Sequence, residues 1–343
     1  MSPSTAEPRR RWLRFAVTVG LTLLVLVVGI SLADEIDWEG VRSSLARLEA
    51  WQLAVLCLGL LLRQWLNALP LALFIEGLSS WRAMQNDQAA ILMTTVAPPP
   101  ADYVMRFAIF TSWGIALPAA VAGSVMNTLS FYVVRFGAPV LGSLLMILLG
   151  TFHLGELLGA LPSMLVSVAI LGALWLAFRG EAFTAALARR AGDLVARVRP
   201  KVSGEAWAES AAGFRRQVIG RVPRALPRSL LALTAMVLVD ATLLVASLRF
   251  VGVDAQQVPA IEVVVAFLVA YPLTLFPFSG IGILDAVVIA TLLSVGTDVY
   301  EEGVIAGFFV WRIVTIGGPI LLGLLSVALW KWELLRRPTT PAA

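Results

Sequence analysis

Long apolar runs separated by short charged stretches set the pattern of this chain. Each run has at least about the 20 residues that a helix needs to cross a bilayer. The runs lie at residues 15–33, 51–74, 114–150, 157–178, 230–250 and 304–330. Short segments of alternating polarity, which are typical of a membrane β-barrel, do not occur along the sequence. The pattern predicts an all-α polytopic membrane protein with about six full spans.

Two further apolar stretches are interrupted by proline or glycine. Residues 86–96 and 101–112 flank APPP, and residues 263–275 and 283–295 flank FPFSGIG. Halves of about 13 residues extend only about 20 Å as helix, against about 30 Å of hydrocarbon. We therefore expect two re-entrant helix hairpins, at 86–112 and 263–296, although short full spans would give the same loop placement and eight spans. The expected hairpin breaks are Pro98, Pro99, Pro100, Pro277, Gly280 and Gly282.

Charged residues between the runs indicate how the chain is oriented. Arginines crowd residues 1–14 and residues 34–49 are mostly acidic, so the positive-inside rule places the N-terminus in the cytoplasm. Residues 179–228 are strongly basic and are expected on the same side. They would form either amphipathic helices on the anionic inner leaflet or a solvated connector. We expect a multi-pass cell-membrane protein with both termini in the cytoplasm.

This orientation divides the chain into five regions. A basic N-terminus (1–14) and a tail (333–343) enclose two membrane halves, 15–178 and 229–332, which the basic linker 179–228 joins. Two broken segments that enter from opposite faces are typical of an inverted-repeat transporter. The direct similarity between TTVAPPPADYVMRF and TLFPFSGIGILDAV is weak and would not by itself establish a repeat.

The amino-acid composition limits which kinds of site this chain can form. Charged residues make up 14% of the chain, against about 25% in soluble domains. One cysteine, Cys57, and one histidine, His153, are too few for a disulfide framework or a zinc site. No phosphate-loop motif occurs, so direct use of ATP is not expected. We expect no metal, no cofactor and no nucleic-acid partner.

Several short motifs resemble the transmembrane region of lysylphosphatidylglycerol synthases, a unit that also occurs as a stand-alone flippase-like membrane protein. Their order and spacing agree with that family over about residues 14–332. The motifs are the proline break leading to Arg106, Arg63 with Trp65, Arg135, SGIGILDA at 279–286, and WRIVTIGGPILLG at 311–323. The resemblance implies a membrane unit that moves lipids.

The chain also departs from the family pattern. The family's first motif reads Pro-Gly-x-x-Gly-Glu-x-x-Arg, and this chain has Asp102 and Tyr103 where Gly-Glu would stand. In the second motif Gly280 and Gly282 match, whereas Asp285 replaces a glutamate. Bifunctional members carry a soluble aminoacyl-transferase domain after the membrane region, and this sequence has none. We therefore expect a transporter-like protein rather than an enzyme.

Ionisable side chains within the apolar segments are the candidate site. At the bilayer centre each costs roughly 2.5–3.5 kcal/mol, so such residues usually face a cavity or a partner. Arginine suits a phosphate headgroup because its planar guanidinium binds in bidentate fashion and stays charged. The expected headgroup-binding residues are Asp102, Tyr103, Arg106, Asp285, Arg312, Arg63, Arg135 and Asp240.

Structural interpretations of the same residues remain open at this point. Arg63 could pair with Asp240 or Asp285 merely to hold helices together. Arg135 could extend to a membrane interface, and Arg106 could pair locally with Asp102 at i, i+4 spacing.

We expect a transporter that moves a membrane lipid with an anionic or zwitterionic, phosphate-bearing headgroup between leaflets. A scaffold subunit that recruits a lipid-modifying enzyme through residues 179–228 is the alternative. A membrane-embedded transferase acting on lipid-linked substrates ranks third, because such enzymes typically need a long external loop and the external loops here are short.

Overall fold

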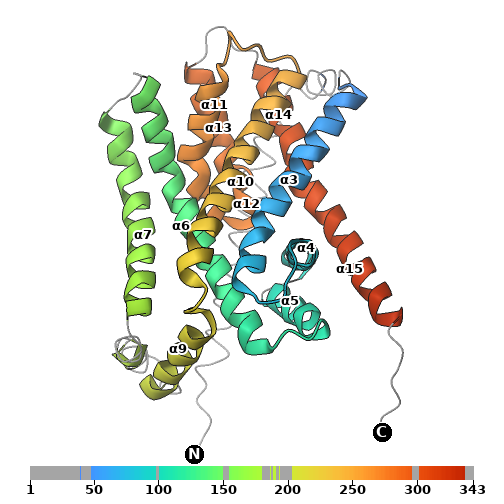
Figure 1. Cartoon of the computed structure of the whole chain (residues 1–343). Helices are drawn as coiled ribbons and strands as arrows, with labels where there is room; N and C mark the ends of the chain where they lie inside the picture. The colour runs from blue at the N-terminus through green and yellow to red at the C-terminus, as the bar shows by residue number, and fades with distance from the viewer. Residues whose placement is uncertain are drawn as a thin grey trace, which may run out of the picture.

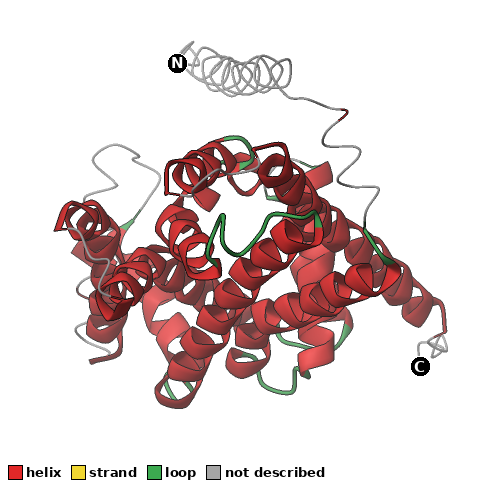
Figure 2. Ribbon diagram, turned by 90° about the horizontal axis from the view of Figure 1, so that it is seen from above, coloured by secondary structure: helices red, strands yellow, loops and turns green. Residues whose placement is uncertain are grey.

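A computed structural model describes most of the chain as helices joined by short loops (Figure 1). The described residues are 39, 48–97, 100–149, 154–179, 186, 188–190, 193, 203–295 and 301–336. Figure 2 shows the same elements from above, with no strand in the described ranges. The predictions for residues 1–38, Pro98, Pro99, His153, most of 180–202 and the tail from residue 337 fall outside them.

The helices follow the apolar runs and are interrupted where proline and glycine cluster. The elements are α3 (Ala50–Phe74), α4 (Ser80–Val96), α5 (Ala101–Ser112), α6 (Leu117–Leu149), α7 (Leu154–Arg179), α9 (Gly204–Val218), α10 (Val222–Phe250), α11 (Ala260–Ala270), α12 (Pro277–Gly280), α13 (Ile283–Val295), α14 (Glu301–Arg312) and α15 (Gly318–Arg336). A 3₁₀ turn, η1 (Tyr271–Leu275), extends α11, and a π turn, η2 (Ile313–Gly317), joins α14 to α15.

Within the described residues, four helices are long and apolar enough to cross a membrane. They cover Ala50–Phe74, Leu117–Leu148, Val222–Phe250 and Glu301–Arg336. Apolar side chains cover most of their surface because lipid replaces water around them. The prediction of an all-α polytopic membrane protein is confirmed. The helix α10 begins at Val222, inside the predicted linker, where Pro223 in its first turn suits a helix start.

Both predicted breaks separate pairs of short helices. α4 and α5 contact each other across residues 97–100, and α11 contacts α13 across residues 276–282. Figure 1 shows α11 and α13 at the upper end of the long helices and α4 and α5 at the lower end. α4 begins at Ser80, before the predicted residue 86, because Ser79 caps the helix by accepting a hydrogen bond from the Arg82 N–H (3.3 Å).

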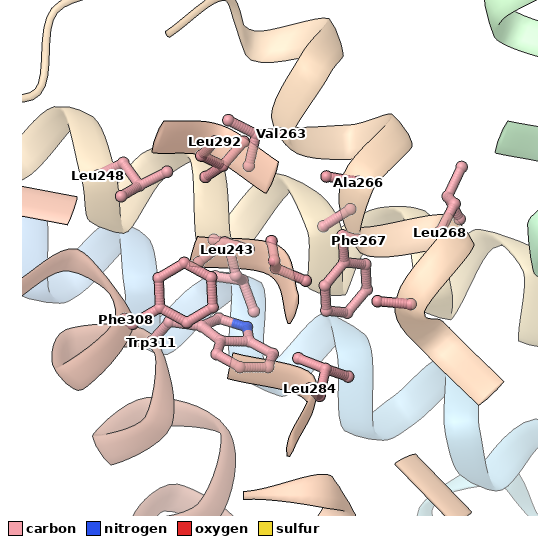
Figure 3. Packing of buried hydrophobic residues seen from close by; sticks show 14 of the residues in the cluster. Leu243, Leu248, Val263, Ala266, Phe267, Leu268, Leu284, Leu292, Phe308 and Trp311 are labelled. Atoms are coloured by element: carbon pink, nitrogen blue, oxygen red, sulfur yellow. The ribbon is translucent and has the colours of Figure 1, made fainter. Parts of the chain in front are cut away.

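The main apolar core forms where α10 meets α11, α13 and α14. Leu243, Leu248, Phe267 and Trp311 lie in this cluster (Figure 3). The rings of Phe267 and Trp311 meet edge to face with centroids 5.6 Å apart, a favoured aromatic arrangement. This packing fixes the position of Trp311 and therefore of Arg312, the next residue along α14.

Candidate functional site

A cavity of about 440 Å³ lies between the two breaks. Thr94 and Thr95 line it from the last turn of α4, just before the first break, and Ser279 lines it from the second break. All three are exposed, so the cavity opens to the molecular surface. Its volume falls in the range of about 300–1,000 Å³ that is usual for ligand pockets. The other polar residues of its lining are Arg63, Gln64, Asn67 and Thr315.

A smaller pocket of about 60 Å³ adjoins this cavity and shares five lining residues with it: Arg63, Phe131, Ser279, Thr315 and Ile316. About 10–15 Å³ holds one water molecule, so the pocket has room for a few waters or for one phosphate-sized group. The charged residues that line it are Arg63, Arg135, Arg312 and Asp240. The cavity and pocket together therefore present more positive than negative charge.

Arg63 on α3 and Asp240 on α10 form a buried ion pair with a nitrogen–oxygen distance of 2.8 Å. The Trp311 indole N–H also donates to the Asp240 carboxylate, at 3.0 Å. Of the two partners expected for Arg63, the structure selects Asp240. Together with Trp311 on α14, the pair joins three helices. It also holds the Arg63 guanidinium where it lines both the pocket and the cavity.

Two side-chain amides extend this network toward α4. The Arg63 guanidinium donates to the side-chain oxygen of Gln64 at 2.5 Å, and the side-chain N–H of Gln64 donates to the side-chain oxygen of Gln88 at 2.8 Å. Gln64 and Gln88 are both buried. Because buried amides need partners, these contacts stabilise the packing of α3 on α4 at the depth of the cavity.

Asp285 and Arg312 hold the second break in place. The Arg312 guanidinium donates twice to one Asp285 oxygen, at 2.6 and 2.9 Å, and once to the Ser279 carbonyl at 3.3 Å. The other Asp285 oxygen accepts from the Gly282 N–H at 3.0 Å, which caps the start of α13. Asp285 itself does not line the pocket. It positions Arg312, which does.

Backbone conformation at the second break requires glycine. Gly280 and Gly282 have φ values of +72° and +82°. A Cβ at Gly280 would lie 2.5 Å from the Leu273 carbonyl oxygen, so that position excludes any side chain. Ser279 also adopts φ +57°, a left-handed conformation that costs free energy in residues other than glycine. The structure thus places a strained, exposed residue at the edge of both the pocket and the cavity.

Arg135 on α6 lines the pocket without a carboxylate partner among the described residues. Its guanidinium stacks on the rings of Phe131 and Tyr132, with centroid distances of 4.6 and 5.5 Å. Its Nε is buried and has no hydrogen-bond partner. The structure therefore places the Arg135 side chain at the pocket and not, as in the alternative interpretation of the sequence, at a membrane interface.

Arg106 at the first break pairs with an acid that the sequence did not single out. Its guanidinium donates to the Asp87 carboxylate at 2.7 Å and to the side-chain amide oxygen of Asn86 at 3.2 Å. Asn67 donates to the second Asp87 oxygen at 2.7 Å, and Asn86 donates to the Arg106 backbone carbonyl at 2.9 Å. The local Arg106–Asp102 pair does not form. Instead Arg106 fastens α5 to α4, and Asp87 connects both helices to α3.

The structure does not bring all the predicted headgroup residues together. Arg63, Arg135, Asp240 and Arg312 line the pocket. Neither the pocket nor the cavity is lined by the other four, which are Asp102, Tyr103, Arg106 and Asp285. Asp102 lies in the first turn of α5, where its negative charge interacts favourably with the positive end of the helix dipole. The headgroup role of these four stays a prediction.

The π turn in the last helix is a feature that sequence reasoning missed. Thr315 and Ile316 line both the pocket and the cavity from this turn. The Thr315 hydroxyl donates to the Trp311 carbonyl at 2.8 Å. Single π turns inside α-helices occur frequently at functional sites. The segment TIGGPI, with two glycines before a proline, was the available signal.

Asp87, Gln64 and Gln88 were also missed. Gln85 to Gln88 is a run of four consecutive polar residues in a very apolar chain, and all four are buried. Such a run inside a membrane protein indicates an internal polar network, because lipid does not tolerate it. Within the described residues, no three histidine, cysteine, aspartate or glutamate side chains cluster as they would around a metal ion.

Comparison with known protein families matches most of the chain. The model of the family described as "Lysylphosphatidylglycerol synthase TM region" matches residues 11–323. This range contains both breaks, the pocket and the cavity. A search of curated proteins gives no match.

Proposed function

Because the chain belongs to the lysylphosphatidylglycerol synthase transmembrane-region family, we propose that it moves an amphiphile with a phosphate-bearing headgroup between membrane leaflets. It is a multi-pass membrane protein of a lipid-related family, and no nucleotide-binding motif occurs in the sequence. In this proposal the chain acts as a transporter and not as an enzyme. Movement follows a lipid or ion gradient.

The observation that carries the proposal is the Arg135 guanidinium at the small pocket. Arg63 and Arg312 are neutralised by Asp240 and Asp285, whereas Arg135 has no acidic partner among the described residues. A partly buried charge without an acidic partner is costly, so an anionic ligand at this position would offset that cost. A phosphate within the pocket gains a charge-assisted hydrogen bond from the unpartnered Arg135 Nε.

The two breaks supply the route. The last turn of α4, just before the first break, and Ser279 of the second break line the same cavity. The exposed Thr94, Thr95 and Ser279 at its edge allow a headgroup to enter while acyl chains stay in lipid. Irregular backbone at this depth is tolerated because it faces a polar cavity. Rocking of one helix pair against the other would move the open side of the cavity from one leaflet toward the opposite one.

The direct test is a leaflet-exchange assay with the full chain in liposomes. A fluorescent phospholipid is quenched from outside by an impermeant reagent, and protein-containing vesicles are expected to lose the inner-leaflet signal faster than empty ones. Arg135→Gln should slow this exchange roughly tenfold to a hundredfold, since a hydrogen bond to a charged group contributes about 1.5–3 kcal/mol.

Arg82→Gln is the matched control for this variant. Arg82 also stacks on an aromatic ring, that of Trp113 at 5.3 Å, but it is exposed and does not line the cavity. Exchange by this variant should equal that of the unmodified chain. The proposal fails if vesicles with protein exchange lipid no faster than vesicles without it.

A further inference from the structure

Two exposed arginines lie in the first turns of α10, at the lower end of the molecule in Figure 1. We infer that Arg224 and Arg228 form a lipid site on the surface of the helix bundle, which holds the phosphate of one anionic phospholipid. This lipid stays bound to the protein and is not the molecule that is moved. The inference is independent of the proposed function, because neither arginine lines the pocket or the cavity.

The charges of these two arginines are not balanced by the protein. Arg221, just before α10, pairs with Glu76 at 2.5 Å, so the acid next to this end of the helix is already engaged. Arg224 and Arg228 form no ion pair within the described part of the chain. The first turn of α10 contains no acidic residue. Two positive charges therefore stand side by side without a counter-charge.

This arrangement is unfavourable for the helix by itself. Residues four positions apart are neighbours on a helix surface, and like charges at that spacing destabilise it. Positive charge at the start of a helix also interacts unfavourably with the helix dipole. A phosphate between Arg224 and Arg228 would offset both effects, since each guanidinium can donate to its oxygens in bidentate fashion. The charge pattern thus favours an anion next to this part of α10.

An exposed apolar strip continues from the arginines along the same side of α10. Leu231 follows Arg224 by seven residues and Arg228 by three, and Leu238 follows seven residues later, so the four side chains share one side of the helix. Leu231 is 71% exposed and Leu238 is 40% exposed. In a membrane these leucines contact acyl chains. A phospholipid can bind both parts of the surface, its phosphate at the arginines and its chains along the leucines, whereas a soluble anion can use only the first.

Packing on the other side of the helix fixes this orientation. Val222 and Ala225 are buried in an apolar cluster against which Phe214 of α9 packs. Because this side of the first turns is held by α9 and its neighbours, Arg224 and Arg228 are directed away from the protein.

Helix length places the two arginines at the level of the lipid headgroups. α10 is about 43 Å long, whereas the hydrocarbon layer is about 30 Å thick. The apolar run begins at residue 230, so Arg228 lies about 3 Å and Arg224 about 9 Å before it along the helix axis. A headgroup layer extends roughly 5–8 Å beyond the hydrocarbon. The basic residues of 179–228 predict that this end faces the cytoplasmic leaflet, where anionic lipids are enriched.

The test uses the full chain in liposomes and reads the strip itself. A fluorophore is attached to Leu238→Cys in the Cys57→Ser background, and lipids with brominated acyl chains quench it on contact. Phosphatidylcholine vesicles contain equal fractions of a brominated lipid, either phosphatidic acid or phosphatidylcholine. An arginine near an anionic membrane surface contributes roughly fivefold in affinity, so we expect phosphatidic acid to be preferred at the strip by about fivefold or more. Equal quenching by the two lipids would overturn the inference.

Arg224→Gln combined with Arg228→Gln should abolish this preference. The matched control combines Arg82→Gln with Arg190→Gln, which removes two other exposed arginines and the same amount of charge. All four positions are exposed, so these changes should have little effect on folding. The control should keep the preference for phosphatidic acid. An unchanged preference in the first variant, or an equal loss in both variants, would show that the two arginines form no specific site.

The measurement is separate from any movement of lipid. Both leaflets of the vesicles have the same composition, so exchange between them does not alter the quenching. A chain that fails to move lipids can therefore still show the preference, and a chain that moves lipids can still lack it.

Discussion

The Arg63 guanidinium lies 2.8 Å from the Asp240 carboxylate and ties α3 to α10 across the centre of the molecule. The two residues come from different halves of the chain, and α3 and α10 are in extensive contact along their lengths. Gly59 lies at this interface, where an added Cβ would come within 2.6 Å of the Leu243 Cδ2 on α10 and would require that side chain to move. The pair therefore has two consequences: it joins the halves, and it places a guanidinium at the cavity wall.

Asp240→Asn should destabilise the protein by about 3–5 kcal/mol, because it leaves the Arg63 charge buried without a partner. The double variant Arg63→Gln with Asp240→Asn should lose less than the sum of the single changes, since both charges are then absent. Denaturant titration in detergent measures both. The control is Arg336→Gln, an exposed guanidinium that stacks on Trp332, with an expected change within about 0.5 kcal/mol. Strict additivity would contradict an energetic coupling of the pair.

Arg106→Gln should loosen the first break, because Asp87 keeps a buried charge after its partner is removed. We expect a loss of stability of about 3 kcal/mol or more, together with slower lipid exchange. Adding Asp87→Asn should restore part of the stability and much of the exchange, since Arg106 does not line the cavity. The comparison is made on equal amounts of folded protein. A stable double variant without exchange would instead support a direct headgroup role for Arg106.

Gly323→Ala should push α15 away from α4. The added Cβ would lie 2.7 Å from the Gln88 carbonyl oxygen and 2.7 Å from the Leu92 Cβ, and neither atom is the end of a flexible side chain. A cost of about 1–3 kcal/mol in the free energy of unfolding is expected. Gly172→Ala on α7 is the matched control, because nothing lies within 4 Å of its added Cβ. That change should be neutral or stabilising by up to about 1 kcal/mol. Equal effects at both positions would show that close helix packing is not the cause.

Cysteine labelling tests the expected orientation of α10. Cys57 is the chain's one cysteine, so Cys57→Ser provides a background without thiols. In that background Asp254→Cys should react with an impermeant reagent from outside the cell, and Arg224→Cys only after the membrane is opened. Both positions are exposed; Arg224 lies in the first turn of α10 and Asp254 lies four residues after its end, and the helix is about 43 Å long. The reverse pattern would invert the proposed topology, and labelling of both from one side would rule out α10 as a span.

Much of the fold could be predicted because its causes are local. The segments 51–74 and 283–295 agree closely with α3 and α13, since helix length follows from an uninterrupted apolar run. The second break was predicted from Gly280 and Gly282, which permit backbone conformations that other residues resist. The start of α10 was misplaced because the basic first turns of that helix resemble a solvated linker.

The site could be predicted only in part. Arg63, Arg135, Asp240 and Arg312 were expected from the cost of charge in lipid, and they do meet at one pocket. The cost of charge in lipid identifies ionisable residues that must face a cavity or a partner, but it does not say which of them share one cavity. Asp102 and Arg106 directly follow a break, yet α5 places them outside the lining. Thr315 reaches the lining only because a π turn changes the direction of the last helix.

By itself, the sequence determined the all-helical membrane architecture, the two interruptions and the set of charged groups in apolar surroundings. These follow from hydrophobic length and from the backbone chemistry of proline and glycine, both of which act within a few residues. Only the tertiary structure decided that Arg63 pairs with Asp240, that Arg106 pairs with Asp87, and that Arg135 forms no ion pair with any acid in the described part of the chain. Charge pairing depends on distances across helix interfaces, and side-chain packing between distant segments sets those distances.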